Sequence, residues 1–195
     1  MSRSSAIALA ATVALAACGE PQAGAQNAAA RADAKASGPI ASAITPAPAS
    51  QTAAADFAGK AAAGDAFELQ AAQLAHQRAT RPAVKTFAAM MLRDHGKSQA
   101  DLKQALSQSG QTLPAGGALS PGQQQGLADL AKASAQDFDK AYMAGQVQAH
   151  QDALTLMQDY AQNGDNPALR AFAGHAAPVV QSHYQMARSL SDQLS

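Results

Sequence analysis

The sequence has no excess of charge of either sign and no long apolar stretch. Its 14 lysine and arginine residues equal its 14 aspartate and glutamate residues, and they form no basic run. Nucleic-acid binding needs clustered Lys and Arg to displace counterions from phosphates, so we expect no nucleic-acid partner. No window approaches the roughly 20 consecutive apolar residues that a spanning helix needs, so we expect no transmembrane segment in the mature protein.

Complete catalytic motifs are also missing. The sequence shows no Ser-His-Asp set, no phosphate-binding loop and no dinucleotide fingerprint. Hydrolase and nucleotide-dependent functions therefore rank below binding functions. Whether the protein is an enzyme stays open from the sequence.

The sequence contains one cysteine, Cys18, and its surroundings indicate export. A positive charge at Arg3 precedes an apolar stretch over residues 6–17, which is typical of a secretory signal. The residues Leu15-Ala16-Ala17-Cys18 resemble the lipobox, at which bacterial lipoproteins are cleaved and acylated. The alternative is an ordinary signal peptide with an incidental cysteine. We expect residues 1–18 to be a lipoprotein signal, and Cys18 to be lipidated and to anchor the protein to a membrane in the periplasm.

The rest of the chain divides into a tether and a folded domain. Residues 19–53 are mostly Ala, Pro, Ser, Gln and Gly, and such a segment buries too little apolar surface to offset its chain entropy. We expect a disordered tether there. Residues 54–195 have the length of a single domain with its own core.

The folded domain shows the periodicity of long helices. Apolar residues recur at steps of three and four within residues 54–79, 82–109, 136–162 and from 167 onwards. Gly110 and Asn163-Gly164 are expected to end helices, and Asn166-Pro167 to begin one. Ser120-Pro121-Gly122-Gln123 is a capping-box signature that predicts a short helix in the middle link.

These elements predict an all-α fold, a ferritin-like four-helix bundle. Two tight turns join the first pair and the last pair of long helices, whereas the link over residues 110–135 is much longer. A link of this length can run along the whole bundle. We therefore expect one long crossover that carries the short extra helix.

One polar residue interrupts the apolar stripe of each long helix, near its midpoint. These residues are Glu68, His95, His150 and His183. A midpoint stays a midpoint whichever way a helix runs, so all four are expected at one depth of the bundle. Three imidazoles and a carboxylate suit one divalent transition metal such as Fe, Mn, Zn or Cu. The alternative is a metal-free Glu–His hydrogen-bond cluster that fixes helix register.

Other residues that could bind or orient a metal are not predicted to be its direct ligands. Asp94 and Asp139 lie beside core positions and could orient the ligands. His76 and His175 are expected on the surface. The methionines could supply soft copper ligands, but we interpret them as core residues; they are Met90, Met91, Met143, Met157 and Met186.

Several separated motifs resemble the bacterial family catalogued as domain of unknown function 4142. They are Phe87-Ala88-x-Met90-Met91-x-x-Asp94-His95, Phe138-Asp139-x-x-Tyr142, Gln146-Val147-x-x-His150, and Pro178 followed by His183. The resemblance covers the whole folded part and implies a ferritin-like bundle that is often exported, with no established reaction. Di-iron members of the ferritin-like group carry Glu-x-x-His pairs, with a glutamate three residues before the histidine. In this sequence that position is occupied by Leu92, Val147 and Val180, before His95, His150 and His183. Di-iron oxidase chemistry is therefore disfavoured.

Two functions of different classes follow. The first is a lipoprotein that binds one metal ion in its bundle core and serves metal handling or envelope stress protection. The second is a metal-free envelope protein that acts through its helical surface on a protein or the cell wall. Histidines that converge would favour the first, and histidines on different faces would favour the second.

Overall fold

The computed structural model describes residues 51–112 and 118–195, and these ranges contain helices and no strands. The helices are α1 (Gln51–Arg78), α2 (Pro82–Gln108), α3 (Pro121–Lys132), α4 (Phe138–Asn163) and α5 (Pro167–Asp192). The predicted all-α class is therefore confirmed. The predicted signal, the lipidated Cys18 and the tether up to residue 50 lie outside the described residues and stay predictions. Within the described ranges, no helix has the length and apolarity needed to cross a bilayer.

The helices begin and end where local chemistry favours it. The Ser120 hydroxyl accepts from the backbone N–H of Gln123, whose side chain accepts from the Ser120 N–H, so the capping box is formed. The Asn166 side chain accepts from the first N–H groups of α5. Gly110 follows α2 with a φ of 67°, a left-handed conformation that favours glycine.

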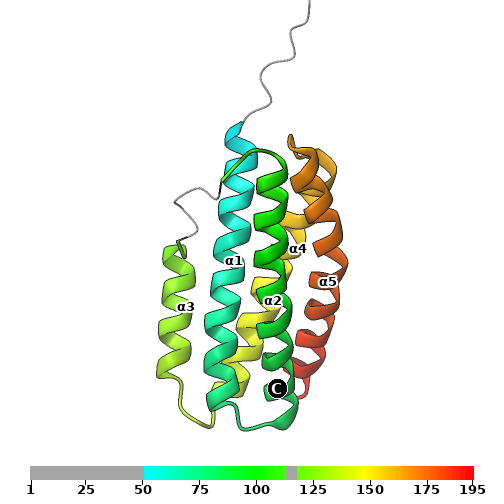
Figure 1. Ribbon diagram of the computed structural model, residues 1–195. Helices are drawn as coiled ribbons and strands as arrows, with labels where there is room; N and C mark the ends of the chain where they lie inside the picture. Colours follow the sequence, from blue (N-terminus) through cyan, green and yellow to red (C-terminus); the bar gives the residue numbers. More distant parts are fainter. Residues whose placement is uncertain (1–50, 113–117) are drawn as a thin grey trace, which may run out of the picture. The chain divides into compact units, whose positions relative to one another are not determined.

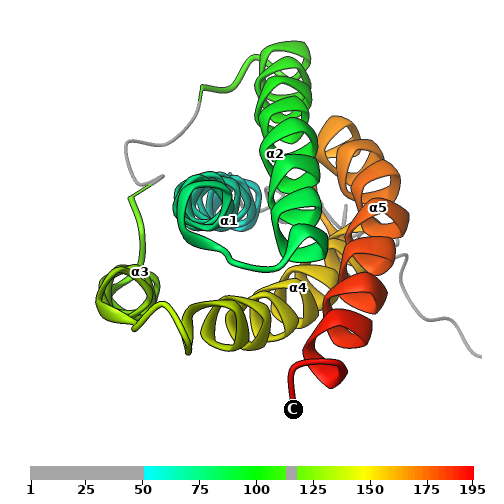
Figure 2. The same ribbon diagram turned by 90° about the horizontal axis from the view of Figure 1, so that it is seen from below.

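The four long helices form a bundle of two hairpins. Helix α1 packs against α2 and α4 packs against α5, while α2 also contacts α5 and α1 contacts α4. Helix α2 ends at one end of the bundle and α4 begins at the other, so the link between them runs the length of the bundle (Figure 1). This confirms the single long crossover. Helix α3, which the crossover carries, lies outside the bundle against α1 and α4 (Figure 2).

Arg78, at the end of α1, holds the crossover in place. Its guanidinium donates to the carbonyl oxygens of Leu130, Ala131 and Ala133, at 3.0, 2.7 and 2.6 Å. These carbonyls lie at the carboxyl end of α3, where a cation is favoured. The same guanidinium lies 4.7 Å from the centre of the Phe138 ring. One side chain thus joins α1, α3 and α4.

The apolar core is divided into two clusters by a polar layer. One cluster contains Phe87, Phe138 and Tyr142, and the other contains Phe57 and Phe172 with their neighbours. Between the two clusters, every long helix presents buried polar side chains, which are Asp65, Glu68, His95, Gln146, His150 and His183. The predicted common depth of one carboxylate and three imidazoles therefore matches the architecture.

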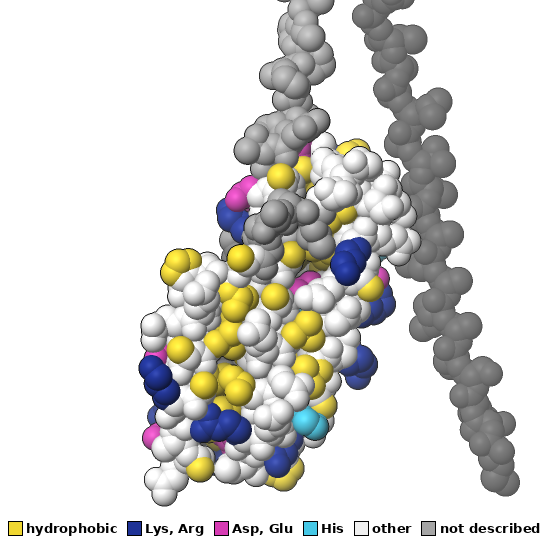
Figure 3. All heavy atoms as spheres, turned by 60° about the vertical axis from the view of Figure 1, so that its left-hand side comes forward, with side chains coloured by type: hydrophobic (Ala, Val, Ile, Leu, Met, Phe, Trp, Pro, Cys, Tyr) yellow, Lys and Arg dark blue, Asp and Glu magenta, His cyan; other side chains and the backbone are white. Residues whose placement is uncertain are grey.

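Few large apolar side chains are exposed among the described residues. Seen from the side of α3, apolar side chains are scattered among charged and polar ones (Figure 3). In the described part of the chain, the large apolar side chains that are exposed are Val179 and Met186, both on α5. Met91, Met143 and Met157 are buried, as predicted, but Met186 is 40% exposed, so its predicted place in the core is wrong. It lies beside Ala187, which takes the inward position instead.

Asp139, near the start of α4, caps the turn between α1 and α2. Its carboxylate accepts from the backbone N–H groups of Thr80 and Arg81 and from the Thr80 hydroxyl, at 2.7 to 3.2 Å. Thr80 and Arg81 lie in the turn between α1 and α2, outside both helices, so their N–H groups have no partner in a helical ladder. The buried carboxylate thus fixes the entry of α2 against α4.

Replacing Asp139 by alanine is expected to lower the free energy of unfolding by about 2 kcal/mol, since a lost cap and unpaired donors each cost about 1 kcal/mol or more. Denaturant titration of both proteins measures this difference. Asp152→Ala is the matched control, because Asp152 is an exposed residue of α4 whose carboxylate meets only Gln148. A loss in D139A no larger than in D152A would contradict the capping role.

Candidate metal centre

Three histidines from three helices meet in the polar layer. His95 on α2, His150 on α4 and His183 on α5 each place one ring nitrogen within 4.8 Å of the other two. Their ring centres lie 5.4 to 5.7 Å apart, and each residue is at most 7% exposed. The histidines therefore converge and do not spread over different faces of the bundle.

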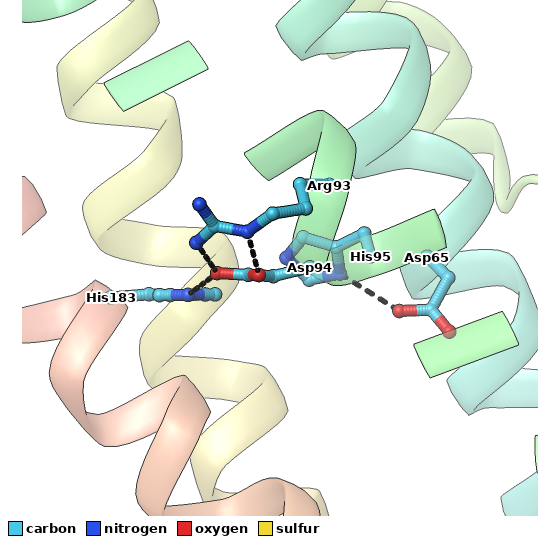
Figure 4. Close-up of polar contacts among 5 residues, drawn as sticks. All are labelled: Asp65, Arg93, Asp94, His95 and His183. Carbon is cyan, nitrogen blue, oxygen red and sulfur yellow. Dashed lines mark hydrogen bonds and ion pairs between the residues drawn. The ribbon is translucent and has the colours of Figure 1, made fainter. Parts of the chain in front are cut away.

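Each ring uses its other nitrogen for a hydrogen bond that points away from the cluster. His95 donates from Nδ1 to Asp65 Oδ1 at 2.8 Å, and His183 donates from Nε2 to Asp94 Oδ2 at 3.1 Å (Figure 4). His150 donates from Nδ1 to the backbone carbonyl of Gln146 at 2.9 Å. Because a carbonyl or a carboxylate can only accept, these bonds place the protons on the outer nitrogens.

The remaining nitrogens are then lone-pair donors with no partner. They are Nε2 of His95, Nε2 of His150 and Nδ1 of His183, all buried and without a hydrogen bond. A buried polar atom without a partner costs about 1 to 3 kcal/mol, so three in one layer need a common explanation. A metal cation accepts all three lone pairs at once, and carboxylate or carbonyl partners on the outer nitrogens are the usual support for metal-binding histidines.

The electrostatics keep two of the imidazoles neutral. Burial, together with the nearby charge of His95, lowers the pKa of His150 to about 3. Burial also lowers the pKa of His183, again with a contribution from His95. Burial opposes protonation of His95 as well, but the hydrogen bond to Asp65 and the charge of Glu68 raise its pKa overall. A metal ligand must be a neutral imidazole, so His150 and His183 are ready to bind.

Glu68 lies next to the histidines but faces a different nitrogen. Its Oε2 accepts from the Gln146 side chain at 2.7 Å, and its Oε1 is 3.8 Å from Nδ1 of His150, the nitrogen already bonded to the Gln146 carbonyl. Burial raises the pKa of Glu68 to about 7, against the charge of His95 and the bond from Gln146. The structure brings Glu68 into the polar layer, and its role as a direct ligand stays a prediction.

The other sequence assignments divide into supported contacts and one correction. Asp94 accepts from His183 and is held by Arg93, whose Nε and Nη2 donate to it at 2.7 and 2.9 Å, and Arg93 lowers the pKa of Asp94. Asp139 was expected to orient a ligand, but its hydrogen bonds go to the α1–α2 turn. This turn lies at an end of the bundle, away from the histidines in the middle. His76 and His175 are exposed, as expected.

Sequence reasoning missed two residues that support the histidines. Asp65 lies three residues before Glu68, hence one turn away on the same face of α1, and it bonds to His95. Gln146 lies four residues before His150 and bonds to both Glu68 and the His150 ring, through its side chain and its carbonyl. The helical spacing to Glu68 and His150 was the signal that could have found both.

The histidines lie in the wall of a large cavity. Its volume is about 1620 Å³, and His95, His150 and His183 all line it. Small residues of α1 and α4 form part of the same wall, namely Gly64, Gly145, Ala149 and Ala153. A Cβ atom added at Gly64 or Gly145 would meet nothing within 4 Å. The cavity that the three histidines line therefore has room for a small ligand.

Comparisons with known proteins agree with this architecture. Residues 39–190 match the family described as Domain of unknown function (DUF4142). Among solved structures, the chain is similar to "CopM in the Cu(II)-bound form", with a TM-score of 0.62 and 19% identity, over 71% of this chain and 95% of that one. At this identity the similarity concerns the fold. No curated protein matches the sequence.

Proposed function

The chain belongs to the Domain of unknown function (DUF4142) family, and we propose that it binds one divalent transition-metal ion in its bundle core. The ligands in this proposal are His95, His150 and His183. The biological role would be metal handling or protection of the cell envelope against metal stress. The family description names no activity, so the proposal is built on the side chains of the site.

The observation that carries the proposal is that each of the three rings has one nitrogen in a hydrogen bond and one nitrogen without a partner. Three rings from three helices each turn a lone pair inward and a hydrogen bond outward. A cluster that only fixed helix register would pair its polar atoms with one another, because unpaired buried atoms are costly. The lone pairs instead remain without partners in the described residues.

The chemistry of the donors favours a borderline ion. Imidazole nitrogen suits Zn, Cu, Fe and Ni, and divalent affinity rises along the first row to Cu. Ligand nitrogens about 2.0 to 2.1 Å from one zinc ion lie no more than about 4 Å apart, so binding draws the three nitrogens slightly together. The similar fold of a protein described as Cu(II)-bound makes Cu(II) the first ion to test, with Zn(II) second.

The cellular setting remains part of the proposal. We propose that residues 1–18 direct export and that Cys18 carries lipid that anchors the protein to a membrane in the periplasm. Residues 19–53 would then separate the bundle from the membrane surface. A protein so placed would meet metal ions as they enter the envelope.

The test is metal binding by the full chain, produced without a histidine tag and stripped with a chelator. One equivalent of Cu(II) or Zn(II) is expected to bind, and an ion at a hundred times its Kd should add about 2.7 kcal/mol to stability, seen as a rise in Tm. The His76→Ala/His175→Ala variant, which removes the exposed histidines, should bind the same single ion. No bound ion and no rise in Tm would refute the proposed function.

A further inference from the structure

The histidine cluster supplies three donors, one fewer than a tetrahedral ion takes. Among the described residues, the group of side chains whose ligand atoms lie within 4.8 Å of one another contains His95, His150 and His183 and no fourth member. Structural zinc sites use four protein ligands, whereas sites with three protein ligands hold a water or another small molecule in the fourth position. With three protein donors, the proposed site would leave one coordination position for a ligand that is not a side chain.

The neighbouring carboxylates lie on the wrong side of the rings to complete the shell. Asp65 and Asp94 bond to the outer nitrogens of His95 and His183, and Glu68 lies 3.8 Å from the outer nitrogen of His150. The two nitrogens of an imidazole point away from each other. Asp65 and Asp94 therefore each have a ring between themselves and the point on which the inner nitrogens converge, and the ring nitrogen recorded near Glu68 is likewise an outer one.

The cavity offers space for a fourth ligand that none of these carboxylates provides. The same three histidines line a volume of about 1620 Å³, whose wall beside them contains Gly64, Gly145 and Ala149. Residues without long side chains leave room for a ligand of a few atoms in this part of the cavity. An imidazole that binds an ion is neutral, so three histidine ligands would leave the ion its full charge, which favours an anion as the added ligand.

We propose that the ion bound by His95, His150 and His183 takes a small anion from the cavity as its fourth ligand. This inference rests on the proposed function and specifies its site: the centre binds the metal and a second, exogenous ligand together. Such a ternary site can receive or release its ion through the added ligand. A fully side-chain-coordinated ion would lack that route.

The experiment uses the full chain loaded with one equivalent of Cu(II) and titrated with azide, a small anion that gives a charge-transfer band when it binds copper. The wild-type protein is expected to show a saturable band that fits one azide per copper. The nitrogen couplings in its electron paramagnetic resonance spectrum should still report three imidazoles. Glu68→Gln should show the same azide band, because this proposal, unlike the prediction from the sequence, gives the fourth position to the anion and not to the Glu68 carboxylate.

The possible outcomes are distinct. Azide binding in both proteins supports the proposal. Copper that is bound but unaffected by azide in the wild type, with a band that develops only in E68Q, would make Glu68 the fourth ligand and overturn it. Bound copper that ignores azide in both proteins would show a closed shell and also overturn it. Failure to bind copper at all would instead remove the proposed function on which the inference rests.

Discussion

Replacing His150 by phenylalanine is expected to lower the affinity for Cu(II) or Zn(II) by roughly 100-fold or more, because loss of an outer partner alone costs about 10- to 100-fold and this change removes a ligand itself. His150 is 1% exposed, and its unpaired Nε2 is one of the three converging donors. Phenylalanine keeps a ring in this buried position, 6.4 Å from the ring centre of Phe87, and removes only the nitrogens. Competition with a coloured chelator measures the affinity.

A second variant separates ligand loss from a folding defect. His183→Ala removes a second converging ligand, on α5, by truncation instead of ring replacement. Both variants should keep the helical circular dichroism of the metal-free wild type and lose the rise in Tm on adding metal. His76→Ala, which removes an exposed imidazole from α1, is the control and should bind metal as the wild type does. Equal metal affinity in the wild type, H150F and H183A would contradict the assigned ligands.

Replacing Glu68 by glutamine is expected to stabilise the metal-free protein by an amount that grows with pH. The pKa of Glu68 is about 7 in the folded protein, against an ordinary value of 4.5 that applies to the unfolded chain, chiefly because burial disfavours the charge. The protonated carboxyl supports folding fully below pH 4.5, and this contribution is lost as the pH rises to about 7. Glutamine is never ionised, so the advantage of E68Q should rise over this window to about 3 kcal/mol and then level off.

Urea titrations of wild type and E68Q at several pH values between about 4 and 8, with chelator present, measure this difference. The pH dependence of His150 and His183 is common to both proteins and largely cancels, whereas that of His95 changes as well, because the charge of Glu68 raises the pKa of His95. Asp56→Asn removes an exposed carboxyl from the same helix and controls for the loss of one negative charge. A difference between wild type and E68Q that is flat with pH would contradict the raised pKa.

Much of the fold could be predicted because its signals are local. The capping residues Ser120 and Asn166 and the stop at Gly110 act within a few residues of the chain, and all three occur as the sequence indicated. The single crossover followed from the long middle link. Met186 was misplaced because it was assigned to the core as an apolar residue type, together with the other methionines, although Ala187 next to it is the residue that turns towards the core.

The sequence could predict the level of the site along the bundle but not the rotation of each helix about its own axis. Midpoint positions placed His95, His150 and His183 in one layer whatever the helix directions, and the structure brings these three together. The rotation of each helix decides which nitrogen faces inward and which carboxylate meets which ring, and no sequence spacing determines it. Spacing could place Asp65 on the same face of α1 as Glu68 but could not show that it bonds to His95, and Asp139 was expected to orient a ligand although it caps the α1–α2 turn.

The three inner nitrogens come from both hairpins, with His95 on the first and His150 and His183 on the second. The site is therefore incomplete until the C-terminal helix has been made and has docked. A nascent or truncated chain that ends before His183 would lack a third of the donors, however well its first hairpin folds. Under the proposed function, loading with one ion would thus report that α5 has been made and that the two hairpins have closed on each other.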